Sequence, residues 1–272
     1  LLNLFNDPAI IGAPRPIRWL IAKLISRRRA PVARAIYAHL GGGSPLVPLT
    51  RKQGVALEAR LREDGTDARV FVAMRYWHPF SDETAREVAA FAPDRIVLLP
   101  LYPQFSTTTT ESSLKDWMRA ARVAGLEAPT HAVCCYPDED GFIAAQVELT
   151  AAALVAASRA GSPRVLFSAH GLPKKTIAKG DPYRRQVETT AAAIARKMGL
   201  GAADWVVCYQ SRVGPLEWIG PSTLGEIERA GRDRVPVVVV PIAFVSEHSE
   251  TLVELDIEYR RKAEAAGVPA YA

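Results

Sequence analysis

Short apolar runs rich in β-branched residues alternate along this chain with segments of helical periodicity. The runs that predict strands cover residues 69–74, 95–101, 130–135, 164–169, 205–209 and 235–240. The segments that predict helices cover residues 53–63, 82–91, 111–124, 139–159, 181–198, 222–230 and 247–265. Helices that return the chain between strands allow the strands to run parallel, so this order predicts a three-layer α/β fold.

Two pairs of segments resemble each other and bear on the number of domains. Residues 96–101 and 237–242 both run from aliphatic residues into a proline, and residues 71–79 and 165–173 both lead through a histidine to a proline. Unrelated α/β units also look alike, so duplication and chance likeness both stay open. We expect two similar Rossmann-like lobes, each a parallel sheet of about four strands flanked by helices, with the active-site cleft between them. The expected lobes are residues 1–160 and 161–272.

The composition is that of an ordinary soluble protein, with 49% hydrophobic and 23% charged residues. The net charge of +5 comes without the basic clustering of a nucleic-acid-binding surface, so no nucleic acid partner is expected. Cys134, Cys135 and Cys208 form an odd set without zinc spacing, which argues against a disulfide framework and favours a reducing cytoplasm. The longest apolar run, 235–245, is interrupted by two prolines and is shorter than the roughly 18 residues that span a bilayer. The chain begins at Leu1 without a secretion signal, and we expect it to be part of a longer chain.

Four glutamates follow the last predicted strand at helical spacing: Glu247, Glu250, Glu254 and Glu258. At about 100° per residue they lie along one face of a helix. Like charges on neighbouring turns repel, so an inward-facing stripe of this kind needs a function. A path for protons or hard cations is one explanation, since oxygen ligands suit such ions, and a solvated helix face is the other.

His170 directly follows the predicted strand 164–169, at the end where open α/β sheets bind their ligands. Gly171 permits close approach of the backbone, and Pro173 ends the extended segment. A histidine in this place is either structural or a base or metal ligand. Ser168 lies nearby but lacks the Gly-x-Ser-x-Gly elbow, so serine hydrolysis is not expected.

Residues 41–43 are three glycines before Ser44, but the lysine of a phosphate-binding loop is absent, which argues against a nucleotide. The segment is either a tight turn or a carboxylate site. For a carboxylate, Ser44 offers a hydroxyl, and Tyr37 and Arg29 on the preceding helical stretch offer further donors.

Aromatic residues follow two other predicted strands: Tyr76 and Trp77 in residues 75–78, and Trp218 at the end of residues 214–218. Such loops suit a flat hydrophobic ligand. Residues 17–29 combine Trp19 and aliphatic residues with four arginines and a lysine, the pattern of a helix that lies at a lipid surface or of a core-facing helix with a basic outer side.

Taken in order, these motifs resemble those of the ferrochelatases, enzymes that insert ferrous iron into a porphyrin to make haem. The resemblance covers nearly the whole chain and includes residues 41–45, 75–79, 102–106, 167–173, 180–183, 210–215, 218–221 and 247–259. It implies that His170 and Glu250 are the catalytic and iron-binding pair. It also implies that Glu247, Glu254 and Glu258 form an acidic path for protons or metal.

The same resemblance assigns porphyrin-binding roles on several motifs. By it, Arg29, Tyr37 and Ser44 hold the porphyrin propionates, and Arg75, Tyr76 and Trp218 line the macrocycle. The chain departs from the family at Gly171, where many relatives have serine, and it lacks the family's opening strand. It stops before the segment that carries cluster-binding cysteines in some members, and Thr107 stands in place of a further cysteine. We therefore expect no iron–sulfur cluster and no required cofactor, with Fe²⁺ as a substrate.

The resemblance implies insertion of ferrous iron into protoporphyrin IX, the final step of haem biosynthesis, through distortion of the macrocycle and removal of its pyrrole protons. Two alternatives stay open: a coproporphyrin ferrochelatase, and a tetrapyrrole- or metal-binding protein without insertion activity. We expect a cytoplasmic protein with peripheral contact to the inner membrane through residues 17–29.

Overall fold

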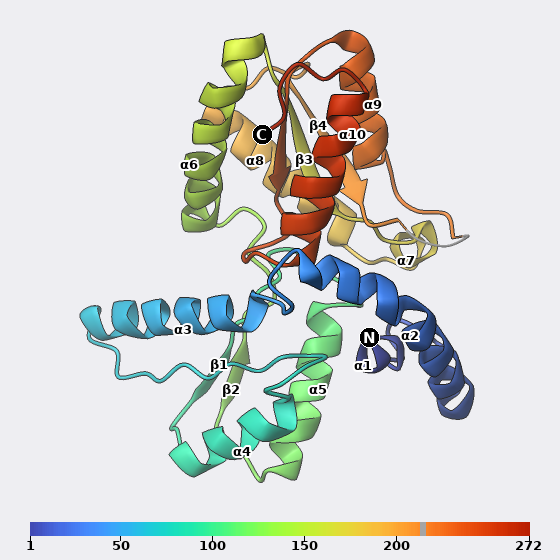
Figure 1. The fold of residues 1–272 in the computed structure, drawn as a ribbon. Coiled ribbons are helices and arrows are strands. Elements are labelled where there is room, and N and C mark those ends of the chain that lie inside the picture. The colour runs from blue at the N-terminus through green and yellow to red at the C-terminus, as the bar shows by residue number, and fades with distance from the viewer. Residues whose placement is uncertain (213–215) are drawn as a thin grey trace. The chain divides into compact units, whose positions relative to one another are not determined.

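Three parallel strands form the sheet in the second half of the chain (Figure 1). The computed structural model describes residues 1–212 and 216–272. In it β3 (Arg164–His170) lies between β4 (Trp205–Gln210) and β5 (Val237–Pro241). These strands confirm the predictions for residues 164–169, 205–209 and 235–240.

Helices cover both faces of this sheet: α6 (Asp140–Ala157), α8 (Tyr183–Met198), α9 (Thr223–Asp233) and α10 (Arg260–Ala265). Alternate side chains of a strand point to opposite faces. Val165 and Phe167 are accordingly buried in a cluster with α6 and α8, whereas Leu166 is buried in a second cluster with α9 and α10. The three layers predicted from the sequence are therefore present.

A smaller parallel sheet lies in the first half of the chain, with β1 (Ile96–Leu98) paired to β2 (Thr130–Ala132). Two amphipathic helices, α4 (Ser81–Phe91) and α5 (Thr110–Val123), pack with this sheet. Their shared core contains Val88, Ile96 and Trp117. The predictions for residues 82–91 and 111–124 are confirmed within a residue at each end.

Three further helices belong to the first half: α1 (Leu2–Phe5), α2 (Arg15–Ala38) and α3 (Leu46–Glu63). The buried residue of α2 is Ala22 and that of α3 is Thr50, so most of their surface faces solvent in this structure. The second half adds the short 3₁₀ helix η1 (Ser158–Ala160) and α7 (Lys174–Ala178).

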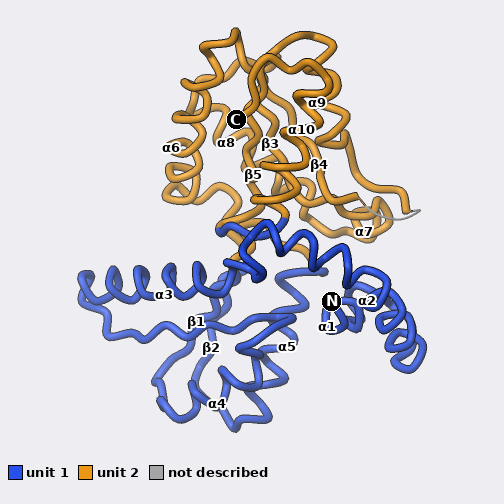
Figure 2. The backbone as a smooth tube through the Cα atoms, viewed as in Figure 1, with its two compact units in different colours: residues 1–100, 107–134, 246–249 blue, residues 101–106, 135–245, 250–272 orange. Residues whose placement is uncertain are grey.

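The chain divides into two compact units, and neither is continuous in sequence (Figure 2). Unit 1 contains residues 1–100, 107–134 and 246–249, and unit 2 contains residues 101–106, 135–245 and 250–272. Gly161, where we expected the division, lies inside unit 2. The reason is that α6 shares the buried cluster of β3 and α8, so it belongs with the second sheet.

Residues 69–74 form no strand, and that prediction is wrong. Side chains of neighbouring helices take the place of a paired strand: Val70 N donates to Glu58 Oε2 at 3.0 Å, and Thr84 Oγ1 donates to Val72 O at 2.8 Å. As described, the sheets therefore have two and three strands, fewer than the about four expected of each lobe.

The predicted helix 247–265 begins later than expected and changes type along its length. Residues Glu250–Tyr259 form a π-helix, η2, which continues into α10. Its i→i+5 hydrogen bonds give a wider turn than an α-helix. Glu247 precedes this helix, so the expected stripe of four glutamates on one helix face is wrong at its first member.

One helical stretch, Asp140–Ala160, is long and apolar enough to cross a membrane by length and composition alone. A single helix of this kind is weak evidence, because core helices of soluble proteins pass the same test. Here Ile143 and Ala157 of α6 are buried against the sheet of unit 2. Other apolar residues of α6 are exposed, Leu149 at 72% and Val155 at 67%, and 17% of the apolar window is buried.

Candidate active site

His170 ends β3, and its backbone is fixed by parallel pairing with Gln210 of β4. Its ring is fixed as well, because Nδ1 lies 2.7 Å from the carbonyl oxygen of Gly171. A carbonyl oxygen can only accept, so Nδ1 carries the hydrogen and donates it. The neutral ring then keeps its lone pair on Nε2.

Glu250, the first residue of η2, lies opposite this nitrogen. Its Oε1 is 3.9 Å from His170 Nε2, and the two side chains are 35% and 38% exposed. The pair offers one nitrogen and one oxygen donor to an incoming cation or proton. Within residues 1–212 and 216–272, no group of three or more His, Cys, Asp and Glu side chains is arranged to hold a metal ion.

A buried phenol, Tyr183, lies in electrostatic reach of this pair. Burial raises the pKa of Tyr183, and the negative charge of Glu250 adds to the shift. The phenol therefore stays protonated at neutral pH. Tyr183 belongs to the motif 180–183, but no role was predicted for it from the sequence.

Glu254 is held by hydrogen bonds on both of its oxygens. Ser211 donates to Oε1 from its backbone nitrogen at 3.0 Å and to Oε2 from its hydroxyl at 2.5 Å, and Tyr259 donates to Oε1 at 2.9 Å. Ser211 follows β4 in the left-handed conformation, with φ of 59°. Glu254 thus fastens the segment after β4 to η2.

The two remaining glutamates of the expected path, Glu247 and Glu258, belong to different parts of the structure. Glu258 is an exposed residue of η2, and Glu247 is an exposed residue of unit 1 outside the helix. Glu250, Glu254 and Glu258 are thus the members that share a helix.

Trp218 lies in unit 2 beside the segment that follows His170. Its backbone forms an isolated bridge with Pro173, and Ile219 N donates to Leu172 O at 3.0 Å. A Cβ atom at Gly171 would come within 2.9 Å of the Gln210 carbonyl oxygen and 3.3 Å of the Trp218 ring. Glycine at 171 therefore permits this close packing. Residues 213–215, part of a predicted ligand-lining loop, lie outside the described residues.

Arg29, Tyr37 and Ser44 lie in unit 1, on α2 and in the turn before α3. Arg29 and Ser44 are exposed, and Tyr37 is half-buried. The Ser44 hydroxyl accepts a hydrogen bond from Leu46 N at 3.3 Å, which places it at the start of α3. Arg29 and Tyr37 are eight residues apart, about 12 Å along the helix at about 1.5 Å per residue.

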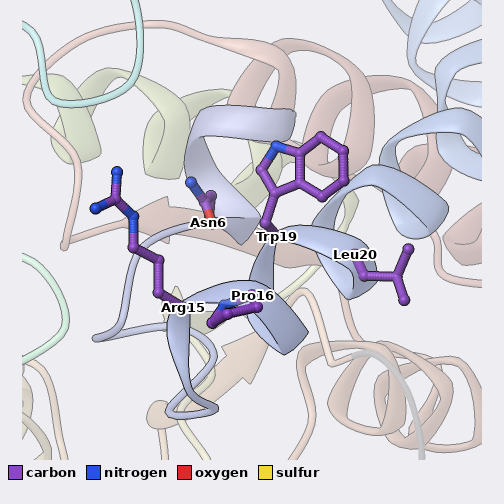
Figure 3. A pocket seen from close by; sticks show the side chains of 5 residues that line it. All are labelled: Asn6, Arg15, Pro16, Trp19 and Leu20. Carbon is purple, nitrogen blue, oxygen red and sulfur yellow. The ribbon is translucent and has the colours of Figure 1, made fainter.

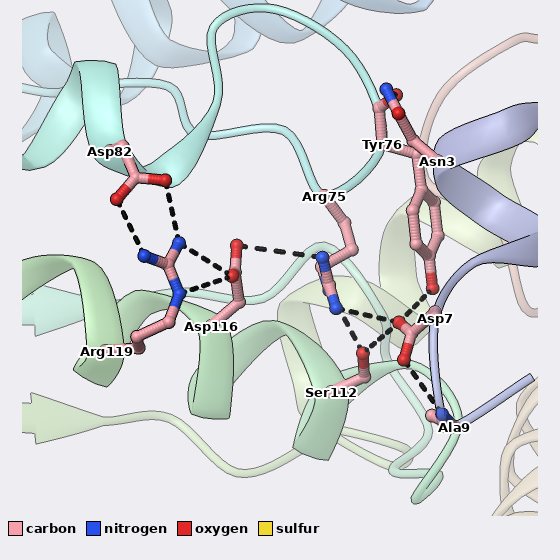
Figure 4. A network of polar contacts seen from close by, with 9 residues as sticks. All are labelled: Asn3, Asp7, Ala9, Arg75, Tyr76, Asp82, Ser112, Asp116 and Arg119. Atoms are coloured by element: carbon pink, nitrogen blue, oxygen red, sulfur yellow. Dashed lines mark hydrogen bonds and ion pairs between the residues drawn. The ribbon is translucent and has the colours of Figure 1, made fainter. Parts of the chain in front are cut away.

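Arg75 and Tyr76 lie in unit 1 within a network of polar side chains (Figure 4). Arg75 donates to Asp7 Oδ2 at 2.8 Å and to Ser112 Oγ at 3.0 Å, and Tyr76 donates to Asp7 Oδ2 at 2.9 Å. Burial and the bond to Asp7 raise the pKa of the Tyr76 phenol. No role was predicted for Asp7 or Ser112 from the sequence. The one signal for Asp7 was its acidic side chain within the apolar stretch 1–11.

An open hollow of about 550 Å³ lies at the start of α2 (Figure 3). Its lining residues are Asn6, Arg15, Pro16, Trp19 and Leu20. Trp19 and Leu20 are 45% and 62% exposed, and Leu24 one turn later is 53% exposed. This part of α2 presents an apolar surface next to basic residues.

Comparison with known proteins gives one consistent family. The ferrochelatase family model matches residues 1–272. A protein of Caulobacter vibrioides named ferrochelatase is 58% identical over 276 residues, which cover all of this chain and 78% of the relative. Ferrochelatases of Phenylobacterium zucineum and of a Wolbachia from Drosophila simulans are 54% and 51% identical, covering 100% and 96% of this chain and 78% and 83% of each relative.

Proposed function

The chain belongs to the ferrochelatase family and is an enzyme that inserts iron into a porphyrin for haem synthesis, and we propose that its substrates are ferrous iron and protoporphyrin IX. We further propose that His170 and Glu250 perform the insertion. The observation that carries this assignment is the ring orientation of His170, whose Nε2 lone pair faces the Glu250 carboxylate at 3.9 Å.

Insertion replaces two pyrrole N–H bonds with bonds to iron, so two protons leave the macrocycle while the iron stays divalent. A distorted macrocycle tilts its pyrrole nitrogens out of the plane and exposes these protons and lone pairs. His170 Nε2 accepts one proton as a general base, and Glu250 accepts the other. The products are haem and two protons that pass to solvent.

For the acidic path we propose fewer members than the four glutamates expected from the sequence. Glu258 is exposed on η2, where it can pass protons to water. Glu254 has both carboxylate oxygens occupied by Ser211 and Tyr259, so its role is to hold η2 and, through it, Glu250. Glu247 as a member of the path stays a prediction.

Porphyrin binding is assigned to six residues by likeness to the family. Propionate binding is proposed for Arg29, Tyr37 and Ser44, because guanidinium and hydroxyl groups donate well to carboxylates. Contact with the macrocycle is proposed for Arg75, Tyr76 and Trp218. The close packing of Trp218 beside Gly171 supports its part of this assignment.

Anaerobic incubation with ferrous iron and either protoporphyrin IX or coproporphyrin, followed by absorbance, tests the function. We expect loss of the free-porphyrin spectrum and formation of haem, faster with protoporphyrin IX. Faster conversion of coproporphyrin establishes the alternative substrate. Porphyrin binding without conversion of either compound contradicts the proposal and supports a binding protein.

His170→Ala tests the catalytic assignment. The variant removes the base and leaves the other pocket residues in place, so we expect insertion to fall by about 10²-fold or more while porphyrin binding persists. His131→Ala, which removes an exposed histidine of β2, is the matched control with unchanged activity. Near wild-type turnover of His170→Ala refutes the assignment.

We propose that residues 17–29 make peripheral contact with the inner membrane, because α2 exposes an apolar surface there. A cytoplasmic location is proposed on separate grounds, since Cys134, Cys135 and Cys208 form no disulfide. In sedimentation with anionic vesicles, Trp19→Glu with Arg27→Glu should lower the bound fraction. Val55→Glu on α3, where Val55 is 71% exposed, should leave it unchanged. Equal binding of both variants and the wild type contradicts the membrane proposal.

We also propose that the enzyme needs no iron–sulfur cluster.

A further inference from the structure

Asp7 is a buried carboxylate that meets four hydrogen-bond donors (Figure 4). Its side chain is 2% exposed. Oδ1 accepts from Ala9 N at 2.8 Å, and Oδ2 accepts from Arg75 Nη2 at 2.8 Å, Tyr76 OH at 2.9 Å and Ser112 Oγ at 2.7 Å. Three segments far apart in sequence therefore meet at one carboxylate.

The charge of Asp7 is maintained by these partners. Burial acts to raise the pKa of Asp7, but the bonds from Ser112, Ala9 and Tyr76, together with the positive charge of Arg75, outweigh it and hold the pKa below its usual value. A buried carboxylate left without such donors is strongly unfavourable, so the four bonds and the charge depend on one another.

Asp7 also determines what Arg75 has available for a ligand. The Arg75 guanidinium donates to Asp7 and Ser112, and its Nη1 lies 3.7 Å from Asp116 Oδ2. Two carboxylates thus face one guanidinium and neutralise most of its positive charge. What Arg75 presents to a ligand is therefore a side chain held in one position. A bond from α1, Asn3 Nδ2 to Tyr76 O at 3.1 Å, holds the backbone of the neighbouring Tyr76.

We infer that Asp7 is a positioning residue for porphyrin binding, acting through Arg75 and Tyr76. The inference rests on the proposed contact of those two residues with the macrocycle. Asp7 itself is buried and touches no substrate. It fixes the direction of the guanidinium and of the phenol ring in the free protein, so that porphyrin meets a surface that is already arranged.

Asp7→Asn tests the inference with a side chain of the same shape. An amide has one oxygen, so it cannot accept from Ala9 N on one side and from the three donors on the other. We expect the porphyrin KM to rise about tenfold, the factor that corresponds to about 1.4 kcal/mol, while kcat and the KM for iron change less than about twofold. Asp82→Asn is the matched control, because Asp82 ends the same network on the exposed side through Arg119, and its porphyrin KM should not change.

A double-mutant cycle separates positioning from general stability. If Asp7 acts through Arg75, adding Asp7→Asn to Arg75→Gln should raise the porphyrin KM less than twofold further. Additive effects, or a lowered melting temperature with unchanged porphyrin KM, overturn the inference. Should Asp7→Asn fail to fold, Ser112→Ala decides the same comparison, with an expected rise of about threefold, since it removes one donor to Asp7 and one acceptor of Arg75.

The proposed function can fail separately. Porphyrin binding is measured directly by quenching of protein fluorescence, without iron. Wild-type protein that binds porphyrin but inserts no iron contradicts the proposed function, and the Kd of Asp7→Asn then still tests Asp7. If the wild type inserts iron and Asp7→Asn has an unchanged porphyrin KM, the positioning role of Asp7 is refuted and the proposed function stands.

Discussion

Replacement of Glu254 by glutamine separates the two roles that an acidic residue of η2 can have. As a member of a proton path, Glu254 would need a carboxylate that gains and loses protons, and Glu254→Gln would impair turnover as Glu250→Gln does. As the fastening of η2 to the segment after β4, it needs three hydrogen bonds. Loss of charge then weakens the fold of unit 2 first.

The size of the effect follows from these bonds. A hydrogen bond to a charged group contributes about 1.5–3 kcal/mol and a neutral one about 0.5–1.5 kcal/mol, so each bond loses about 1 kcal/mol in the variant. The amide oxygen can keep the two bonds at Oε1, and the Ser211 hydroxyl can turn to accept from the amide nitrogen. Because the site is partly exposed, we expect a total loss of about 2 kcal/mol, or about 5 °C in melting temperature for a chain of this size.

Urea denaturation and thermal melting of Glu254→Gln, Glu258→Gln and the wild type measure this loss. Glu258 is exposed, so its variant is the matched control and should differ from the wild type by less than about 0.5 kcal/mol. Equal stability of the two variants would falsify the fastening role. Unchanged stability with turnover reduced as in Glu250→Gln would return Glu254 to the path.

Three further outcomes are expected. Glu250→Gln should lower turnover at least about tenfold more than Glu258→Gln in the iron-insertion assay, since Glu250 faces His170; equal losses contradict the pair. The pKa of Asp7 is lowered from 3.8, so its contribution to stability is complete above that pH and lost as pH falls through the folded-state pKa. The stability difference between the wild type and Asp7→Asn should therefore be constant from about pH 5 to 8 and shrink below about pH 4 in urea titrations, and a gap that widens with acid contradicts this sign. Burial raises the pKa of Cys208 to about 12, so iodoacetamide at pH 8 should label the exposed Cys134 and spare Cys208 until unfolding; rapid labelling of Cys208 in mass spectra would contradict its burial.

The sheet of unit 2 could be predicted from the sequence because its strands are buried on both faces. Such strands are continuous apolar runs with sharp ends, and His170 was placed correctly at the end of one of them. Residues 69–74 have the same composition, yet their backbone groups bond to Glu58 and Thr84 side chains. Apolar composition alone does not distinguish a strand from an extended segment held by neighbouring helices.

The candidate site was predictable to the extent that it depends on position in the chain. The spacing of the glutamates assumed an α-helix, and the π-helix η2 has no composition signal that separates it from one. Asp7 could not be recognised from the sequence as a partner of Arg75 and Tyr76, because residues 7, 75 and 112 become neighbours only on folding. Tertiary hydrogen bonds of this kind leave no periodic trace in a sequence.

The discontinuous make-up of the two units has a consequence for synthesis on the ribosome. Residues 246–249 belong to unit 1 and residues 250–272 to unit 2, so neither unit has all of the residues described for it until residue 249 or later has been synthesised. At about 5–20 residues per second, translation from the end of the second segment of unit 1 to its last segment takes on the order of 10 s. Through that interval Leu166 of β3 lacks Ala263, its later partner in the buried cluster with α9 and α10. Through that interval the nascent chain presents an open apolar sheet face, and we expect chaperones that recognise apolar surface to bind it.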